Sequence, residues 1–194
     1  MKGLNINLGS DQQPRFSCDC HKLNCAVRKS IKQHKHFSSI LKKLNSSNAH
    51  FKRSIALNKI FKEKKCRLRL INDIRWSSQF LMLESCLRAY NNGAFDTDDE
   101  QIKCPVSMAV IETYVRILKP AYLFSINMQY NNSTMMDIIP GVLNLLNAWM
   151  EMKDSLSEIP KKYCSLIIEC TENKFKYELN SQIYLVRFFI KKYL

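Results

Sequence analysis

Apolar residues recur every three or four positions along much of this chain, which is the period of an α-helix. The spacing is clear after Lys22 and after Trp76, where the apolar positions are Leu23, Ala26, Val27, Ile31, Phe80, Leu83, Leu87 and Tyr90. Only four glycines and five prolines occur in 194 residues, which argues against collagen, linker arrays and turn-rich β-sandwiches. We therefore expect a mainly α fold with little β, forming one compact domain or one domain with an appended helical lobe.

Local signals divide the first half of the chain into expected elements. Ser46 or Ser47 is expected to cap a helix that points Phe51, Ile55, Leu57 (or Ala56), Ile60 and Phe61 inward. The alternating segment 66–71 is the best strand candidate, and 15–18 is a second short one. Asn91-Asn92-Gly93 predicts the stop of the helix that follows Trp76.

The second half is expected to be helical beyond an acidic loop at 94–104. Pro120 should break or kink the helix that starts near residue 105, and Pro140 with Gly141 should kink or start the next one. One or two further helices are expected over 155–194, the last of them strongly apolar.

Positive charge is concentrated in one part of the chain. The stretch from Arg15 to Arg75 holds seventeen of the 30 Lys and Arg but only three of the 17 acidic residues, so it carries all of the net charge of +13. Such a field attracts phosphate backbones without reading any base, so we expect a nucleic-acid surface. The alternatives are a solubilising face, or a surface that docks on the acidic residues 96–100.

Compartment signals favour the nucleus or cytosol. No run of about 18 apolar residues occurs, so we expect no membrane-spanning segment. Residues 1–16 lack the apolar centre of a signal peptide. In a reducing compartment the eight cysteines should stay mostly as thiols.

The densest group of soft metal-ligand types consists of Cys18, Cys20, His21 and Cys25, with His34 and His36 beyond them. Four such residues can enclose a zinc ion. However, paired C-x-x-C knuckles are missing, and the first three residues lie too close together for an ordinary zinc finger. Reduced thiols that pack as small hydrophobic residues are the favoured interpretation.

A second group is the charged turn Asp73-Ile74-Arg75-Trp76-Ser77-Ser78. Ser77 or Ser78 is a candidate helix cap, and Trp76 is favoured as a core indole beside an exposed arginine. The alternative is that Arg75 and Trp76 stack on an exposed nucleobase.

No motif for a catalytic nucleophile, a phosphate-binding glycine loop or a metalloprotease occurs in the sequence. Asp11, Asp19 and Asp73 are carboxylates of the kind that bind divalent metals in phosphoryl transfer, but their spacing does not favour such a site.

Four segments, in order, resemble the middle of hAT-superfamily transposases over residues 15–190: SCDCHKLNCAVRKSI, HFKRSIALNKIF, LRLINDIRWSSQFLMLESCLRAY and VIETYVRILKPAYLFSINMQYNNSTMMDIIPGVLNLL. The Cys-x-x-His-x-Leu-Asn-Leu block of the family is matched by Cys18, His21, Leu23 and Asn24, with Cys25 in place of the second leucine. The Thr-Arg-Trp-Asn-Ser motif is matched by residues 74–78. Residues 81–84 and 118–120 match as well.

The resemblance implies a fold and a set of site residues. Residues 1–75 would be a basic, partial RNase H-like segment and residues 76–194 an all-helical insertion lobe, in one continuous unit. Family members cut and rejoin DNA with Mg²⁺ held by two Asp and one Glu, close to the Cys-x-x-His pair. Their tryptophan lies against the DNA. Carried over, the positions near that site are Cys18, His21, Arg75 and Trp76.

The departures from the family pattern decide the expected function. The first Asp and the Glu are expected outside this segment, Asp11 matches the second Asp poorly, and the BED-type finger is absent. We therefore expect a truncated or degenerate, transposon-derived nuclear protein. It would be non-catalytic and without a cofactor, with Mg²⁺ relevant only if the missing acids come from elsewhere.

The expected partner is DNA, bound through Arg28, Lys29, Lys52, Arg53, Lys59, Lys62, Arg75 and Trp76. The alternative function is a protein-interaction module, in which the apolar faces of 134–152 and 179–190 dock on transposase-like chains. A residual Mg²⁺-dependent nuclease has no evident mechanism without a set of coordinating acids.

Overall fold

The computed structural model describes residues 18–72, 74–96, 102–130 and 135–180. Seven α-helices and no strand occur in this part of the chain, so the expected mainly α fold is confirmed. The helices are α1 (Asp19–Gln33), α2 (Lys35–Arg53), α3 (Ile55–Glu63), α4 (Ser77–Asn91), α5 (Met108–Tyr130), α6 (Met135–Lys153) and α7 (Glu158–Asn180).

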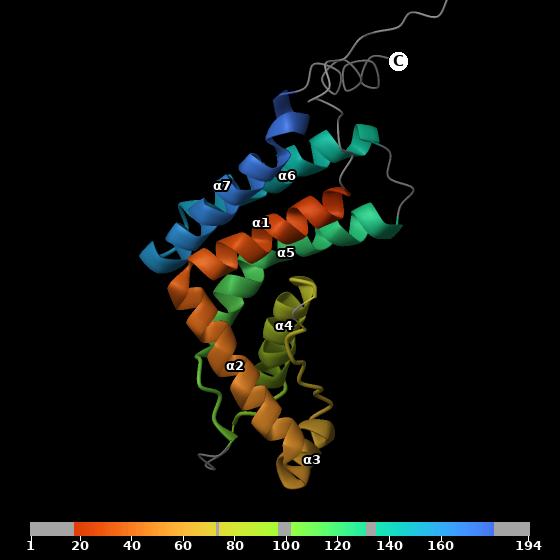
Figure 1. The fold of residues 1–194 in the computed structure, drawn as a ribbon. Coiled ribbons are helices and arrows are strands. Elements are labelled where there is room, and N and C mark those ends of the chain that lie inside the picture. Colours follow the sequence, from red (N-terminus) through yellow and green to blue (C-terminus); the bar gives the residue numbers. More distant parts are fainter. Residues whose placement is uncertain (1–17, 73, 97–101, 131–134, 181–194) are drawn as a thin grey trace, which may run out of the picture.

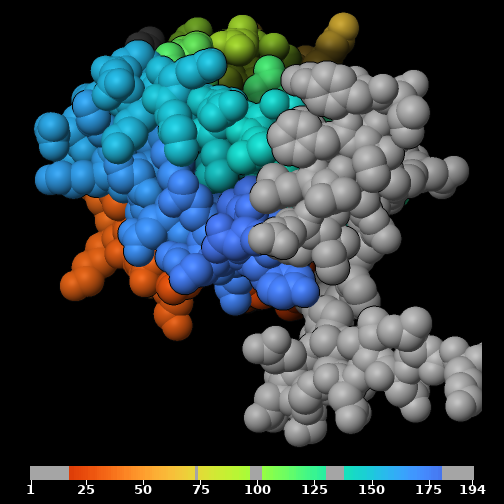
Figure 2. Space-filling model, turned by 90° about the horizontal axis from the view of Figure 1, so that it is seen from above, coloured from red at the N-terminus to blue at the C-terminus, as the bar shows by residue number. Residues whose placement is uncertain are grey.

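The helices form two adjoining groups (Figure 1). Helices α1, α5, α6 and α7 run side by side in the upper group, where α1 packs most extensively against α7. Helices α2, α3 and α4 form the lower group, and α5 joins the two by packing on both α4 and α6. Seen from above, α6 and α7 cover much of the described surface, and atoms of the first helices protrude at its edge (Figure 2). A single apolar core contains residues from both sides of the expected 75/76 boundary.

The first three helices are separated by single residues rather than by loops. His34 lies between α1 and α2, and its Nδ1 accepts a hydrogen bond from the Phe37 amide at 3.2 Å. Ser54 caps α3 by accepting from the Leu57 amide at 3.3 Å. The expected cap at Ser46 or Ser47 is wrong, because the buried residues Leu44, Asn48 and Phe51 continue the helical period of α2 through this point.

The expected inward face of 51–61 is largely correct. Phe51, Leu57 and Phe61 are buried, and Ile60 is partly buried against the core. Ile55 is the exception, with 89% of its surface exposed. It is the first residue of α3, directly after the capping residue Ser54, and its side chain is exposed to solvent.

The expected strand at 66–71 is wrong: this segment contains no helix and no strand pairing. Its side chains do alternate at the start, with Cys66 and Leu68 buried and Arg67 and Arg69 exposed. Side chains take the place of a neighbouring strand, because Asn45 and Asn48 of α2 and Ser85 of α4 bind its backbone. Of the second strand candidate, residues 15–17 lie outside the described part of the chain, and Cys18 precedes α1 without forming a strand.

Two helices end in the same left-handed turn, although only one of them has a glycine there. After α4, the Gly93 amide donates to the Tyr90 carbonyl and the Ala94 amide to the Ala89 carbonyl, as expected for a Schellman stop. After α3, the same two bonds run from Lys65 to Lys62 and from Cys66 to Phe61. Lys65 therefore takes a positive φ of 55°, a conformation that strains a residue with a Cβ.

Pro120 and Pro140 lie inside helices rather than at their ends. Helix α5 continues through Pro120, where the missing N–H removes one intrahelical bond, and its ribbon changes direction along its length (Figure 1). The Trp149 indole of α6 donates to the nearby Ile117 carbonyl at 2.7 Å. Pro140 and Gly141 likewise lie within α6. Of the segment expected to be strongly apolar, residues 181–194 lie outside the described residues.

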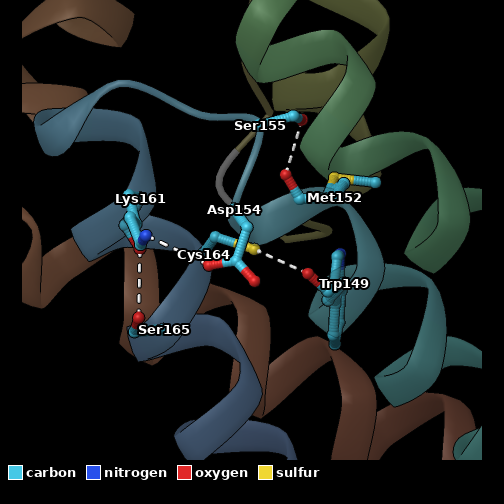
Figure 3. A network of polar contacts seen from close by, with 7 residues as sticks. All are labelled: Trp149, Met152, Asp154, Ser155, Lys161, Cys164 and Ser165. Carbon is cyan, nitrogen blue, oxygen red and sulfur yellow. Dashed lines mark hydrogen bonds and ion pairs between the residues drawn. The ribbon is translucent and has the colours of Figure 1, made fainter.

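The turn between α6 and α7 is closed by polar contacts (Figure 3). Lys161 binds Asp154 at 3.1 Å, and the Ser155 hydroxyl donates to the Met152 carbonyl at 2.7 Å. Deeper in the bundle, the Cys164 thiol donates to the Trp149 carbonyl at 3.4 Å. These contacts hold the start of α7 against the end of α6. All eight cysteines are free thiols.

Substituting Gly141 with Ala should destabilise the fold although alanine is the better helix former. A Cβ at Gly141 would lie 2.6 Å from Cε2 of the buried Phe124 ring. We expect the crowding to outweigh the gain in helix propensity, so that the free energy of unfolding falls by about 1–2 kcal/mol in urea denaturation. In a Phe124→Leu background the same substitution should cost less. Equal losses in both backgrounds would contradict the predicted contact.

Substituting Lys65 with Gly should stabilise the protein by about 1 kcal/mol, because glycine adopts the positive φ without strain. Lys64→Gly is the matched control, since it also removes one exposed lysine but at a φ of −78°. We expect the control to lose stability. Urea denaturation of both variants measures the two effects, and shifts of the same sign would refute the prediction.

Candidate nucleic-acid interface

The basic charge of the first segment lies on the protein surface. All fifteen Lys and Arg from residue 28 to residue 75 are exposed: Arg28, Lys29, Lys32, Lys35, Lys42, Lys43, Lys52, Arg53, Lys59, Lys62, Lys64, Lys65, Arg67, Arg69 and Arg75. Lysine stems on an amphipathic helix commonly cover apolar surface while the charged head stays in water. We call these fifteen residues the basic surface.

The basic surface has few acidic partners. Within the described ranges, one ion pair involves it, between Lys59 and Glu63 at 3.9 Å, and both side chains are exposed. An exposed pair at this distance contributes little and is screened by salt. The acidic stretch 96–100 was the alternative partner of the basic surface. Asp96 is exposed, and the rest of the stretch lies outside the described residues. Apart from Lys59, the basic surface therefore forms no ion pair with an acid in the described part of the chain.

A groove of about 370 Å³ interrupts the basic surface between the end of α2, α3 and the extended segment that follows it. Lys52, Lys62 and Arg67 line it together with Asn58, and the buried residues at its base are Phe51, Phe61, Cys66 and Leu68. We call it the basic groove. Lys52 and Lys62 were expected contacts, whereas Arg67 and Asn58 were not singled out from the sequence.

The two motifs that resemble the transposase family meet in a second hollow, of about 780 Å³. Cys18 and His21 line it from the start of α1, and Arg75 and Trp76 line it from the turn before α4. Asn24 joins them, because its Oδ1 accepts a hydrogen bond from the Trp76 amide at 3.1 Å. The far wall belongs to α5, through Tyr122, Ser125, Ile126, Met128 and Gln129. We call this hollow the motif pocket.

Trp76 is a core residue with only 3% of its surface exposed, whereas Arg75 is exposed. This is the favoured of the two arrangements expected for the pair. In this conformation the indole offers no open face for a nucleobase. The expected cap at Ser77 or Ser78 is wrong, because Trp76 is the N-cap residue and no side chain caps the helix. The Ser78 hydroxyl instead closes the preceding turn by donating to the Asn72 and Arg75 carbonyls.

The Cys and His residues at the start of α1 contact one another only as a pair. Cys25 Sγ lies 3.4 Å from His21 Nε2, but no group of three or more potential ligands converges among the described residues. Burial raises the pKa of the Cys20 thiol, and the neighbouring Cys18 raises it further, so the reactive thiolate form of Cys20 is disfavoured. His34 is used as a helix cap, and His36 Nδ1 lies 3.4 Å from the Tyr114 hydroxyl.

Asp19, the one carboxylate of the candidate metal set that is described, is already paired. Lys22 binds Asp19 at 3.3 Å and also forms an ion pair with the buried Glu178 of α7. Desolvation raises the pKa of Asp19 even though Lys22 opposes this effect. Asp11 and Asp73, the other two members, lie outside the described residues.

None of the seven described helices combines the length and the apolar character that a membrane span requires. No protein-family model, curated protein or solved structure matches the chain. The case for a function therefore rests on the basic surface, the basic groove and the motif pocket.

The stability of the fold should depend on pH through His34. Burial lowers the pKa of His34, and the nearby His36 lowers it further, although a hydrogen bond with the Ile159 backbone opposes this. The neutral ring also accepts the capping bond from Phe37 at Nδ1, and protonation removes that acceptor. The unfolded chain, with a histidine pKa near 6.5, therefore binds the proton more readily than the folded one.

We accordingly expect full stability above the ordinary histidine pKa and a progressive loss as the pH falls from about 7 to 5. Urea denaturation across this range measures the loss. His34→Asn should flatten the pH dependence, because asparagine also caps helices but does not titrate. His36→Asn is the control and should keep a clearly steeper pH dependence than His34→Asn, because His34 is still present. An unchanged slope in His34→Asn would exclude His34 as the cause.

Proposed function

We propose that the protein binds nucleic acid, DNA in particular, through the basic surface. The observation that carries this proposal is the exposure of all fifteen Lys and Arg between residues 28 and 75, with one exposed acid in ion-pair distance among the described residues. Contacts from such residues go mainly to phosphates, which gives sequence-tolerant and salt-sensitive binding. The centre of the proposed contact lies on adjoining turns of α2 and α3, at Lys52, Arg53, Lys59 and Lys62. The other expected contacts lie farther along the chain, at Arg28, Lys29 and Arg75.

The proposal extends to a transposon origin and a nuclear location. The resemblance to hAT transposases is supported by the motif pocket, where residues fifty or more positions apart in the sequence line one hollow. In that interpretation the first 75 residues derive from an RNase H-like segment and the helices after Trp76 from the insertion lobe. Trp76 would act by holding the turn that presents Arg75, rather than by stacking on a base.

We propose a binding role rather than a catalytic one, without a cofactor of its own. Asp19 supports this view, because Lys22 already neutralises it and links it to Glu178. A Mg²⁺ ion would need acids supplied from elsewhere.

Protein interaction is the second candidate. Leu143 and Met150 of α6 and Leu123 of α5 are exposed apolar side chains that a transposase-like partner could cover. Much of the apolar face expected at 134–152 is already used inside the fold, however. Ile138, Val142, Leu145, Leu146 and Trp149 are all buried in the core. This observation makes nucleic-acid binding the stronger proposal.

Salt dependence tests the proposal directly. If six or more phosphates are contacted, the affinity for a DNA duplex should fall about a thousandfold or more between about 50 and 200 mM salt. Fluorescence anisotropy with a labelled oligonucleotide measures this. An apolar protein interface would instead be nearly insensitive to salt.

A triple variant locates the surface. The variant combines Lys52→Gln, Arg53→Gln and Lys62→Gln. It should bind DNA more weakly, and the slope of log affinity against log salt concentration should fall in magnitude by about two to three. Lys119→Gln, Lys174→Gln and Lys176→Gln remove the same charge from exposed positions on α5 and α7 and should leave the slope nearly unchanged. Equal effects of the two triple variants would show attraction by net charge alone, without a defined surface.

A further inference from the structure

The floor of the basic groove is closely packed and apolar. Phe51, Phe61, Cys66 and Leu68 line it and are each less than a tenth exposed. The ring centroids of Phe51 and Phe61 lie 5.1 Å apart. Phe61 also packs edge-on against Phe95, with 5.5 Å between the ring centroids. The strained turn at Lys65 directs Cys66 into this floor, since the Cys66 amide binds the Phe61 carbonyl at 2.7 Å. The groove is therefore formed before any ligand arrives.

The rim of the basic groove carries unused polar groups. Lys52, Lys62 and Arg67 are exposed, and no acid within the described ranges lies close enough to pair with them. Asn58, which is partly buried, makes no side-chain hydrogen bond to any described residue. Its amide offers a donor and an acceptor side by side, which is the pattern that matches the edge of a nucleobase.

A groove with cations and an amide at its rim and apolar side chains at its floor suits a nucleotide better than a bare phosphate. A volume of about 370 Å³ lies near the lower end of small-ligand pockets. A duplex would touch only the rim, because its bases are paired and stacked inside. An unpaired base can enter the groove and reach the Asn58 amide while its phosphate meets the cations of the rim.

We propose that the basic groove binds one unpaired nucleotide of a single-stranded nucleic acid, with Asn58 on the base edge and Lys52, Lys62 and Arg67 on the flanking phosphates. This inference rests on the proposed function and deepens it. It assigns to the protein a preference for single strands that the basic surface alone does not give.

The test compares a labelled single strand with the duplex of the same length at one salt concentration, by fluorescence anisotropy. The wild-type protein should bind the single strand more tightly. Asn58→Ala should weaken single-strand binding about fivefold or more and leave duplex binding within about twofold. Because alanine favours the helix, this variant is expected to fold. Asn144→Ala, at an exposed position on α6, is the matched control and should change neither affinity.

A photocrosslink locates the bound base. A strand that contains 4-thiothymidine should crosslink to residues lining the groove, which peptide mass spectrometry would place within 51–68. Wild-type binding of both polymers with no preference, or equal effects of Asn58→Ala on both, would overturn this inference while leaving the proposed function intact. Failure to bind either polymer would overturn both.

Discussion

The arrangement of the basic surface depends on how the extended segment 66–71 is held between α2 and α4. The Asn48 amide donates to the Arg69 carbonyl at 3.0 Å, Ser85 accepts from the Arg69 amide at 3.0 Å, and Asn45 accepts from the Ile71 amide at 2.9 Å. Buried backbone groups need such partners, and here side chains supply what a neighbouring strand would otherwise give. These contacts keep Cys66 and Leu68 buried in the core and Arg67 exposed to solvent. The same contacts therefore form both the floor and the rim of the basic groove.

The partly buried cation Lys22 shows how the chain keeps a strongly basic segment compatible with a helical core. Burial alone would lower the pKa of Lys22, but the hydrogen bond and charge of Glu178, helped by Asp19, raise it overall. Lys22 therefore stays charged and ties α1 to α7, while the fifteen basic residues after it remain at the surface. A buried pair of this kind is costly to break on one side only, because it leaves an uncompensated charge.

Local patterns in the sequence predicted the features that depend on one helix alone. The helical spacing of apolar residues correctly predicted α1 and α4, and Gly93 correctly predicted where α4 ends. Prediction failed where a distant partner decides the outcome. The alternation at 66–71 predicted an extended backbone, but whether a strand forms depends on a neighbour, and here that neighbour is three side chains. Arg67 and Asn58 were missed for the same reason, since only the packing of α3 against 66–68 brings them to one groove.

The pairing of α1 with α7 has a consequence for the order of events during synthesis. The buried face of α1, which includes Leu23, Val27 and Ile31, packs mainly against a helix that begins at Glu158. At ordinary translation rates the ribosome needs on the order of ten seconds to add the intervening residues. During this time α1 has no α7 to cover it, whereas α2, α3 and α4 can pack among themselves. The basic residues from Lys35 to Arg75 should thus acquire their structure early, whereas the bundle that carries α1, with Arg28, Lys29 and Lys32, should close last.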